Sequence, residues 1–417
     1  MPIIILILLL LYFLKDYKKG TILILLLMPL LGIVNLAGQG LNLWLGCVVV
    51  GKWFLVSKDK FKAIRLSGFM WIVLLMTFSY LISNYYAVTP HLPSVIANII
   101  QLFLIFVLAD YLTLYPHLRV YALKVVLCTA TILVVNGLIE TIARYNILLS
   151  LAIGTGLYPD STTIITEIRY GLKRAQSAFA MHTSWGGYTF VVFCFLFYLK
   201  KYCGVTFRHT NALLILLGMN LFFTGARSAF LGFVVALLAF LDLKDLKSKK
   251  IWGLILLVIA ISPLFLGYFD DVVSSFTDTT KVNGSNADMR QTQFDICFYY
   301  LFQSPWIGNG IAFTWEHVLP QNEDLCGAES IWIPVLIDQG WLGAIAVGLT
   351  FLTCIWYLKK HNNFRYGIVV LGFLVFNSMS SIPNINLTDF IYYIILLCTF
   401  PRTKMTCEHE RTIKKIA

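Results

Sequence analysis

The stretch SVIANIIQLFLIFVLADYLTL-YPHLR-VYALKVVLCTATILVVNGLIET, residues 94–141, decides the fold of this chain. Two apolar runs flank a short basic break, and each run can cross the roughly 30 Å hydrocarbon core of a bilayer as a helix. The same alternation continues in both directions, since 59% of all residues are hydrophobic, 13% are charged and the mean hydropathy is +0.78. The sequence therefore predicts an all-α, polytopic helical membrane protein in which residues 1–417 form a single membrane domain.

Apolar runs separated by short polar breaks predict about 12–13 transmembrane helices. The first run has no basic amino end and no small-residue cleavage site, so it is interpreted as a short span and not as a signal peptide. The predicted spans are 2–14, 21–36, 40–56, 68–88, 94–114, 120–141, 184–199, 211–224, 228–242, 251–268, 331–358, 366–382 and 388–400.

Positive charge is distributed unevenly among the breaks. The chain has 32 Lys and Arg against 21 Asp and Glu, and these basic residues concentrate in every second break. Cytoplasmic loops carry such an excess, so the pattern predicts a cytoplasmic tail at 402–417 and two outer loops, at 142–183 and 269–330. No basic stripe with interleaved aromatic residues stands on a polar surface, so no nucleic-acid partner is expected.

The larger outer loop, 269–330, has internal order. Residues 289–302 alternate polar and apolar types at helical spacing, with Phe294, Phe298, Leu301 and Phe302 predicted to share one face. This pattern predicts an amphipathic helix that lies on the outer leaflet. Cys297 and Cys326 also fall in this loop, where an oxidising compartment would allow a disulfide between them.

Arginine occurs in outer segments, against the charge pattern of the rest of the chain. Arg227 lies between two spans with almost no loop, where a charge is costly unless it faces a cavity, another charge or a ligand, or reaches the headgroups. Arg290 begins the amphipathic helix, where it could bind a phosphate or pair with a nearby acid. Arg169 and Arg174 end the smaller outer loop. Such arginines, meeting at the membrane surface, would suit a pyrophosphate or an anionic headgroup.

Glu329 stands where the large outer loop returns to the membrane. It is expected in the first turn of a helix, where it is either a carboxylate favoured by the helix dipole or a base that accepts a proton from a sugar hydroxyl. Asp338 lies deeper, and a structural contact is expected for it. His182 and His317 are alternative bases. The sequence contains no metal-binding motif, P-loop or GxSxG element, so neither a metal nor a cofactor is expected.

Three elements in fixed order resemble the O-antigen ligase and polymerase superfamily of bacterial surface glycan assembly. They are FTGARSAFLG (223–232), ADMRQTQFDICFYYLFQSPWIGNG (287–310) and ESIWIPVLIDQGWLG (329–343), preceded by RAQSAFAMHTSWGG (174–187). Arg227, Arg290 and Arg174 fall on arginines of the family. A family His-Asn pair is replaced by Glu329-Ser330.

The resemblance implies a GT-C-like, inverting, metal-independent glycosyltransferase on the outer face of the bacterial inner membrane. Its substrates would be undecaprenyl-pyrophosphate-linked glycans, with Arg227, Arg290 and Glu329 catalytic. Arg169, Arg174, His182 and His317 would bind the pyrophosphate or the glycan. The missing family His favours a Wzy-type polymerase over an O-antigen ligase. A ligase and a lipid-linked glycan flippase are the alternatives, and the sequence leaves open whether a chain-length regulator binds.

Overall fold

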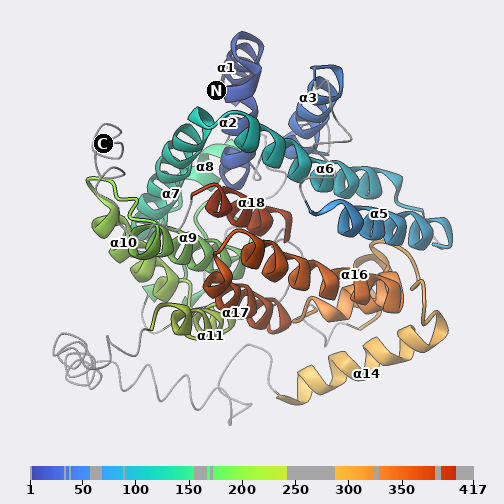
Figure 1. The fold of residues 1–417 in the computed structure, drawn as a ribbon. Helices are drawn as coiled ribbons and strands as arrows, with labels where there is room; N and C mark the ends of the chain where they lie inside the picture. The colour runs from blue at the N-terminus through green and yellow to red at the C-terminus, as the bar shows by residue number, and fades with distance from the viewer. Residues whose placement is uncertain are drawn as a thin grey trace.

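The computed structural model describes residues 2–31, 34–36, 39–56, 68–87, 90–154, 167–169, 172–241, 287–322, 328–380 and 387–400. Within these ranges the chain is helical apart from two short antiparallel hairpins. The first joins β1 (Asn35–Leu36) to β2 (Gln39–Gly40), and the second joins β3 (Ile168–Arg169) to β4 (Leu172–Lys173). The all-α, polytopic architecture predicted from the sequence is thereby confirmed (Figure 1).

The predicted spans coincide with helices wherever the structure describes them. The predicted span at 251–268 lies outside the described residues, as do 269–286, 323–327 and the tail at 402–417. The helices at the remaining spans are α1 (Pro2–Lys15), α2 (Tyr17–Leu31), α3 (Leu41–Val56), α5 (Met70–Tyr85), α6 (Leu92–Leu114), α7 (His117–Ala143), α9 (His182–Tyr202), α10 (Thr210–Phe223), α11 (Arg227–Leu237) with its 3-10 extension η2 (Leu238–Phe240), α16 (Trp332–Lys360), α17 (Gly367–Ser378) and α18 (Leu387–Cys398).

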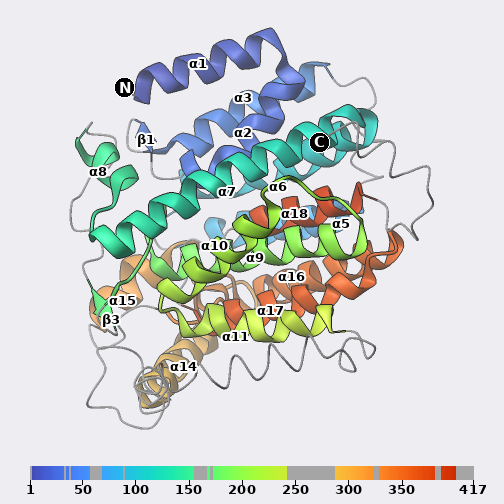
Figure 2. The same cartoon turned by 90° about the vertical axis from the view of Figure 1, so that its left-hand side faces the viewer.

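Three of these helices, α6, α7 and α16, are individually long and apolar enough to cross a bilayer. Figure 2 shows the long helices running side by side, with the described parts of the predicted outer loops gathered at one end of the bundle. We call this the loop end. It carries the β3–β4 hairpin, α8 (Ile147–Gly154), α14 (Ala287–Gln303), the π-helical turn η5 (Thr314–Val318) and α15 (Leu319–Gln321).

Basic residues at the opposite end of the bundle cover the carboxyl ends of helices, whose last carbonyls have no partner within the helix. Arg119 donates to the carbonyls of Leu112 in α6 (3.0 Å) and Thr399 after α18 (3.3 Å). After α11, Lys201 donates to the carbonyl of Phe240 (2.7 Å), and Arg365 donates to those of Ala239 and Leu241. We call this the basic end. Its position opposite the loop end agrees with the charge pattern of the sequence.

Helices α11 and α17 cross at two glycines. A methyl group on Gly232 would lie 2.6 Å from the carbonyl oxygen of Gly372, and one on Gly372 would lie 2.4 Å from the carbonyl oxygen of Gly232. Small residues allow helix backbones in a membrane to approach this closely. The crossing therefore fixes α11, and with it Arg227 at its first position, against α17.

Helix α14 lies across the loop end and packs on α16 (Figures 1 and 2). The expectation that Leu301 shares a face with the three phenylalanines is wrong. Leu301 is 1% exposed and packs with Cys297 against α16, whereas Phe302 is 77% exposed and continues an outward row with Phe294 and Phe298. The Cys297 thiol is free, and burial raises its pKa to about 12. Cys326, the other cysteine of the disulfide considered above, lies outside the described residues.

Candidate functional site

A break in α16 organises the loop end. Gly340 has φ +63° and ψ −158°, outside the helical region, so the surrounding backbone groups lose their helical partners. Such groups must find others within a membrane protein, and the loop at 304–310 provides them. Four backbone hydrogen bonds join the two segments: Trp341 N–H to Pro305 O (2.8 Å), Leu342 N–H to Trp306 O (3.1 Å), Asn309 N–H to Ile337 O (2.9 Å) and Gly310 N–H to Asp338 O (3.0 Å).

The Asp338 carboxylate continues this docking. Its Oδ1 accepts from the amide (2.8 Å) and the hydroxyl (2.6 Å) of Thr314, and its Oδ2 accepts from the amide of Ala312 (3.1 Å). The structural contact expected for Asp338 is confirmed. Gly308, with φ +72°, fits against the same helix, because a methyl group there would lie 2.3 Å from backbone atoms of Asp338. The turn after α14 is thus held rigidly on α16.

Arg290 and Glu329 meet above this scaffold. Arg290 lies in the first turn of α14, and its Nη2 is 3.4 Å from Glu329 Oε2. Charge-assisted hydrogen bonds are usually about 2.8 Å long, so the two groups are paired without being locked together. Their side chains are 32% and 21% exposed, which leaves both open to a ligand. Glu329 is thus a partner of Arg290 that lies 39 residues away along the chain.

Glu329 is not in the first turn of a helix, contrary to the prediction, because α16 begins only at Trp332. Its backbone amide donates to Oε1 of Gln293, a buried side chain on α14 (3.2 Å). The segment that carries Glu329 is therefore fastened to the same helix that carries Arg290. The helix-dipole explanation for this carboxylate loses its basis, and its position is set by α14.

Arg174 and Arg227 form a second group. The Arg174 guanidinium is buried and donates to the carbonyls of Thr224 (2.9 Å) and Gly225 (3.2 Å), and it pairs with Glu167 (2.7 Å). These carbonyls belong to the turn directly before α11. Arg227, half-buried, is the first residue of that helix. Arg174 therefore holds the turn that presents Arg227.

Helix α17 relates the two groups. The Ile331 amide donates to the Asn377 carbonyl (2.9 Å), which ties the segment after Glu329 to the loop end of α17. Asn377 follows Gly372 by five residues, and Arg227 precedes Gly232 by five. At 1.5 Å per residue both stand about 7.5 Å from the glycine crossing, toward the loop end. Arg227 therefore lies at the level at which α17 holds the Glu329 segment.

The other predicted site residues lie at the same end of the bundle. Arg169 is in the β3–β4 hairpin, where its backbone pairs with Leu172. His182 is half-buried and begins α9. His317 is half-buried in η5, with its ring centroid 4.9 Å from that of Phe313.

Two side-chain contacts at the loop end were not predicted from the sequence. His91 Nε2 lies 2.6 Å from Glu316 Oε1, and this contact links the turn before α6 to η5. Lys173 pairs with Glu140 of α7 at 3.3 Å, and both side chains are buried. Lys173 and Glu316 fall in the predicted outer loops and Glu140 at the end of the predicted span 120–141, but no local sequence pattern joins residues so far apart.

Comparison with known proteins bears on the resemblance seen in the sequence. Residues 212–348, which run from α10 into α16 and include Arg227, Arg290 and Glu329, match the family described as O-Antigen ligase. The resemblance to the O-antigen ligase and polymerase superfamily is thereby confirmed. The chain is thus a multi-pass membrane protein in which residues 212–348 are similar to the O-Antigen ligase family. No curated protein matches the chain.

Proposed function

We propose that this protein is a polysaccharide polymerase that joins undecaprenyl-pyrophosphate-linked oligosaccharide repeat units on the outer face of the bacterial inner membrane. The observation that carries the proposal is the partly exposed Arg290–Glu329 pair at the loop end, within the matched O-antigen ligase region. A cation for a diphosphate and a carboxylate for a sugar hydroxyl are the two groups that glycosyl transfer from such a donor requires.

The lipid diphosphate is already a good leaving group, so the enzyme must neutralise its charge and orient the acceptor. The acceptor hydroxyl oxygen attacks the anomeric carbon, and the bond from that carbon to the pyrophosphate oxygen breaks. The bonding electrons leave with the lipid diphosphate, and the hydroxyl proton goes to Glu329. Attack opposite the leaving group inverts the anomeric centre. No metal ion is required in this scheme, because guanidinium groups supply the positive charge.

The 3.4 Å contact between Arg290 and Glu329 suits a switch on substrate binding. In the absence of substrate the guanidinium rests against the carboxylate. An arriving diphosphate offers Arg290 stronger acceptors in a planar, bidentate geometry. Glu329 is then released to accept the acceptor's proton. Arg227 provides a second cation for the diphosphate, and Arg174 acts through the turn that it holds.

The glycan is assigned to the remaining side chains of the loop end. Arg169, His182 and His317 have donors for sugar hydroxyls or for the second phosphate. The outward row of α14 and the neighbouring Trp306, which is 69% exposed, are suited to the interfacial zone of the outer leaflet. A donor anchored by a polyprenyl chain would reach Arg290 along this aromatic surface.

The test is reconstitution of the purified protein in lipid nanodiscs with a lipid-linked repeat unit as donor and acceptor. A ladder of longer lipid-linked glycans supports the proposal, and one repeat unit should be added at each step. Unchanged chain length, with the protein folded and the substrate bound, would overturn it. The variant Arg290→Ala serves as the inactive control.

A ligase is the second candidate, favoured by the description of the matching family. A deletion strain separates the two on a gel. Loss of the polymerase leaves single repeat units on the surface, whereas loss of a ligase leaves none and accumulates lipid-linked polymer. Movement of substrate across vesicles without any change in its length would instead indicate the flippase.

A further inference from the structure

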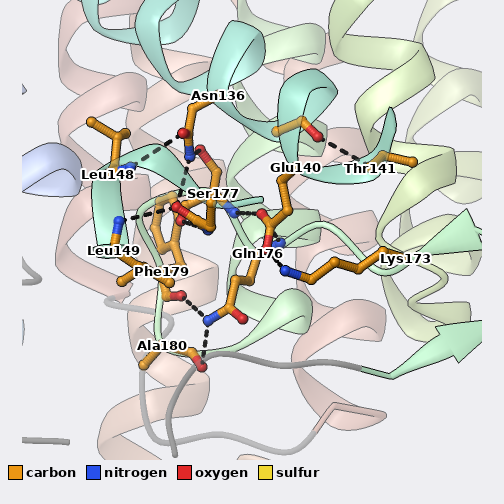
Figure 3. Close-up of polar contacts among 12 residues, drawn as sticks. Asn136, Glu140, Thr141, Leu148, Leu149, Lys173, Gln176, Ser177, Phe179 and Ala180 are labelled. Atoms are coloured by element: carbon orange, nitrogen blue, oxygen red, sulfur yellow. Dashed lines mark hydrogen bonds and ion pairs between the residues drawn. The ribbon is translucent and has the colours of Figure 1, made fainter. Parts of the chain in front are cut away.

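A buried carboxylate on α7 is linked to the Arg227 turn by a short segment, residues 173–177, that we call the strap. Glu140 is fully buried near the loop end of α7. Its Oε2 accepts from the backbone amides of Gln176 (2.9 Å) and Ser177 (2.8 Å), and its Oε1 lies 3.3 Å from the Lys173 ammonium. Figure 3 shows both ends of the strap converging on this one carboxylate.

The middle of the strap binds the other side. The Arg174 guanidinium donates to the carbonyls of Thr224 and Gly225, and the Ala175 amide donates to the carbonyl of Phe223 (3.1 Å). Lys173, Gln176 and Ser177 therefore bind Glu140, while the two residues between them bind the end of α10 and the turn before Arg227. The strap connects α7 to that turn through consecutive residues.

The strap is held in a backbone conformation that it would not adopt on its own. Ser177 has φ +50°, a left-handed value that costs a non-glycine residue free energy. Its hydroxyl donates to the Leu133 carbonyl (2.7 Å), and its carbonyl accepts from the Asn146 amide group (2.7 Å). Glu140 holds the amide of the same residue. Strained residues fixed by so many contacts are characteristic of segments that position a functional group.

Stability alone does not account for the buried charges. Replacing a buried ion pair by apolar residues of similar size is often neutral or stabilising, because two desolvated charges gain little on balance. A leucine and a methionine would fill this space but could not accept hydrogen bonds from the two backbone amides. What Glu140 adds is the fixed position of Gln176 and Ser177, and through Arg174 the fixed position of the Thr224–Gly225 turn.

We propose that Glu140 is a positioning residue for the Arg227 site: through the strap, it fixes the turn from which Arg227 reaches the diphosphate. This inference rests on the proposed function for its effect on catalysis. Glu140 itself touches no substrate. A displacement of about 1 Å in a group that binds the reacting centre can slow an enzyme by about 100-fold, so loosening the strap is sufficient to impair turnover.

The test compares two double variants of the full-length protein in nanodiscs. In Glu140→Leu/Lys173→Met the pair is replaced without leaving a charge buried, but the two amides lose their acceptor. In Glu140→Gln/Lys173→Met the Gln oxygen can still accept both. Asp110→Asn is the matched control, because Asp110 is another buried carboxylate, on α6, that accepts from the Trp53 indole (2.9 Å) and has no contact with the strap.

We expect the Gln/Met variant to retain the unfolding temperature and the Leu/Met variant to unfold at a lower temperature while still folding, because two buried amides lose their acceptor. Hydrogen exchange should accelerate in peptides covering 172–180 and 222–230 in the Leu/Met variant only, and its turnover should fall on the order of 10- to 100-fold. The Gln/Met variant and Asp110→Asn should resemble the unaltered protein. In an Arg174→Ala background the Leu/Met change should add little, because both act on the same turn.

Unchanged exchange at 222–230 in the Leu/Met variant, or a Gln/Met variant as slow as the Leu/Met one, would overturn the proposal. Should the Leu/Met variant not fold, Glu140→Asp retains the charge pair and withdraws the carboxylate from the two amides, so it must show the same acceleration. The exchange measurement decides whether the strap holds the turn, and its result does not depend on which reaction the protein catalyses. Absence of polymer from the unaltered protein would overturn the proposed function and leave that decision intact.

Discussion

The two halves of the candidate site are built by different means. The half at 172–228 is held by buried charged side chains that bind backbone groups, namely Arg174 at the Thr224–Gly225 carbonyls and Glu140 at the strap amides. The half at 287–343 is held by backbone hydrogen bonds around glycines and by the Asp338 carboxylate, without an arginine among the described groups that dock the 304–310 loop. The contrast indicates that an arginine in the first half can be structural. In the second half the backbone docks the loop on α16, so Arg290 is available to a ligand.

The largest effect is expected for Arg290→Ala. Loss of a cation that stabilises charge developing in the transition state typically slows an enzyme by about 10²–10³-fold. The free energy of unfolding should stay within about 0.5 kcal/mol of the unaltered protein, since the pair is partly exposed. Turnover and thermal unfolding in nanodiscs measure both. A large loss of stability would mean that Arg290, like Arg174, is a structural arginine, and the contrast between the two halves would disappear.

Gly308→Ala tests the backbone scaffold of the second half. The added methyl group would lie 2.3 Å from α16 backbone atoms, and φ is +72°, so a destabilisation of about 3 kcal/mol is expected. Gly348→Ala is the matched control, because a methyl group on that α16 residue meets nothing within 4 Å. Thermal unfolding of the two variants gives the comparison. Equal stability would mean that the 304–310 loop is not docked as described.

Arg174→Ala tests the first half. Two backbone carbonyls lose a charged donor, so we expect about 2 kcal/mol of destabilisation, together with reduced turnover per folded molecule. Arg174→Lys should not restore stability, since an ammonium cannot reproduce the fork that reaches Thr224, Gly225 and Glu167. Denaturation and activity assays check this. Full stability with lost activity would instead place Arg174 among the ligand-binding arginines.

The smallest effect is expected for Phe302→Ser on α14. Phe302 is 77% exposed, so in detergent the free energy of unfolding should change by no more than about 0.5 kcal/mol. In nanodiscs turnover should fall a few-fold, because the outward row loses contact with lipid. Leu301→Ser, its buried neighbour, should be destabilising in both settings. A Phe302 effect that is the same in detergent and bilayer would argue against the interfacial position of α14.

Local patterns in the sequence predicted what depends on local physics. Apolar runs predicted the helices, and basic breaks predicted at which end of the bundle each loop lies. Both depend on contiguous residues, because burial in lipid and charge at the membrane surface act locally. Helix α14 and the shared face of Phe294, Phe298 and Phe302 were predicted from periodicity. Leu301 was predicted on the same face but packs with Cys297 against α16. The pairings of Arg290 with Glu329 and of Lys173 with Glu140 join residues far apart, and no local pattern specifies them.

The glycine crossing of α11 and α17 has a consequence for how this class of enzyme can change its substrate. With Gly232 and Gly372 in backbone contact, neither helix can slide along the other. The depth of Arg227 along the bundle is therefore fixed. Accommodation of a new sugar or linkage must then come from the outer segments. Under the proposed function, grafting those segments from a relative onto an unchanged α11–α17 core should transfer sugar selectivity while Arg227 keeps its depth.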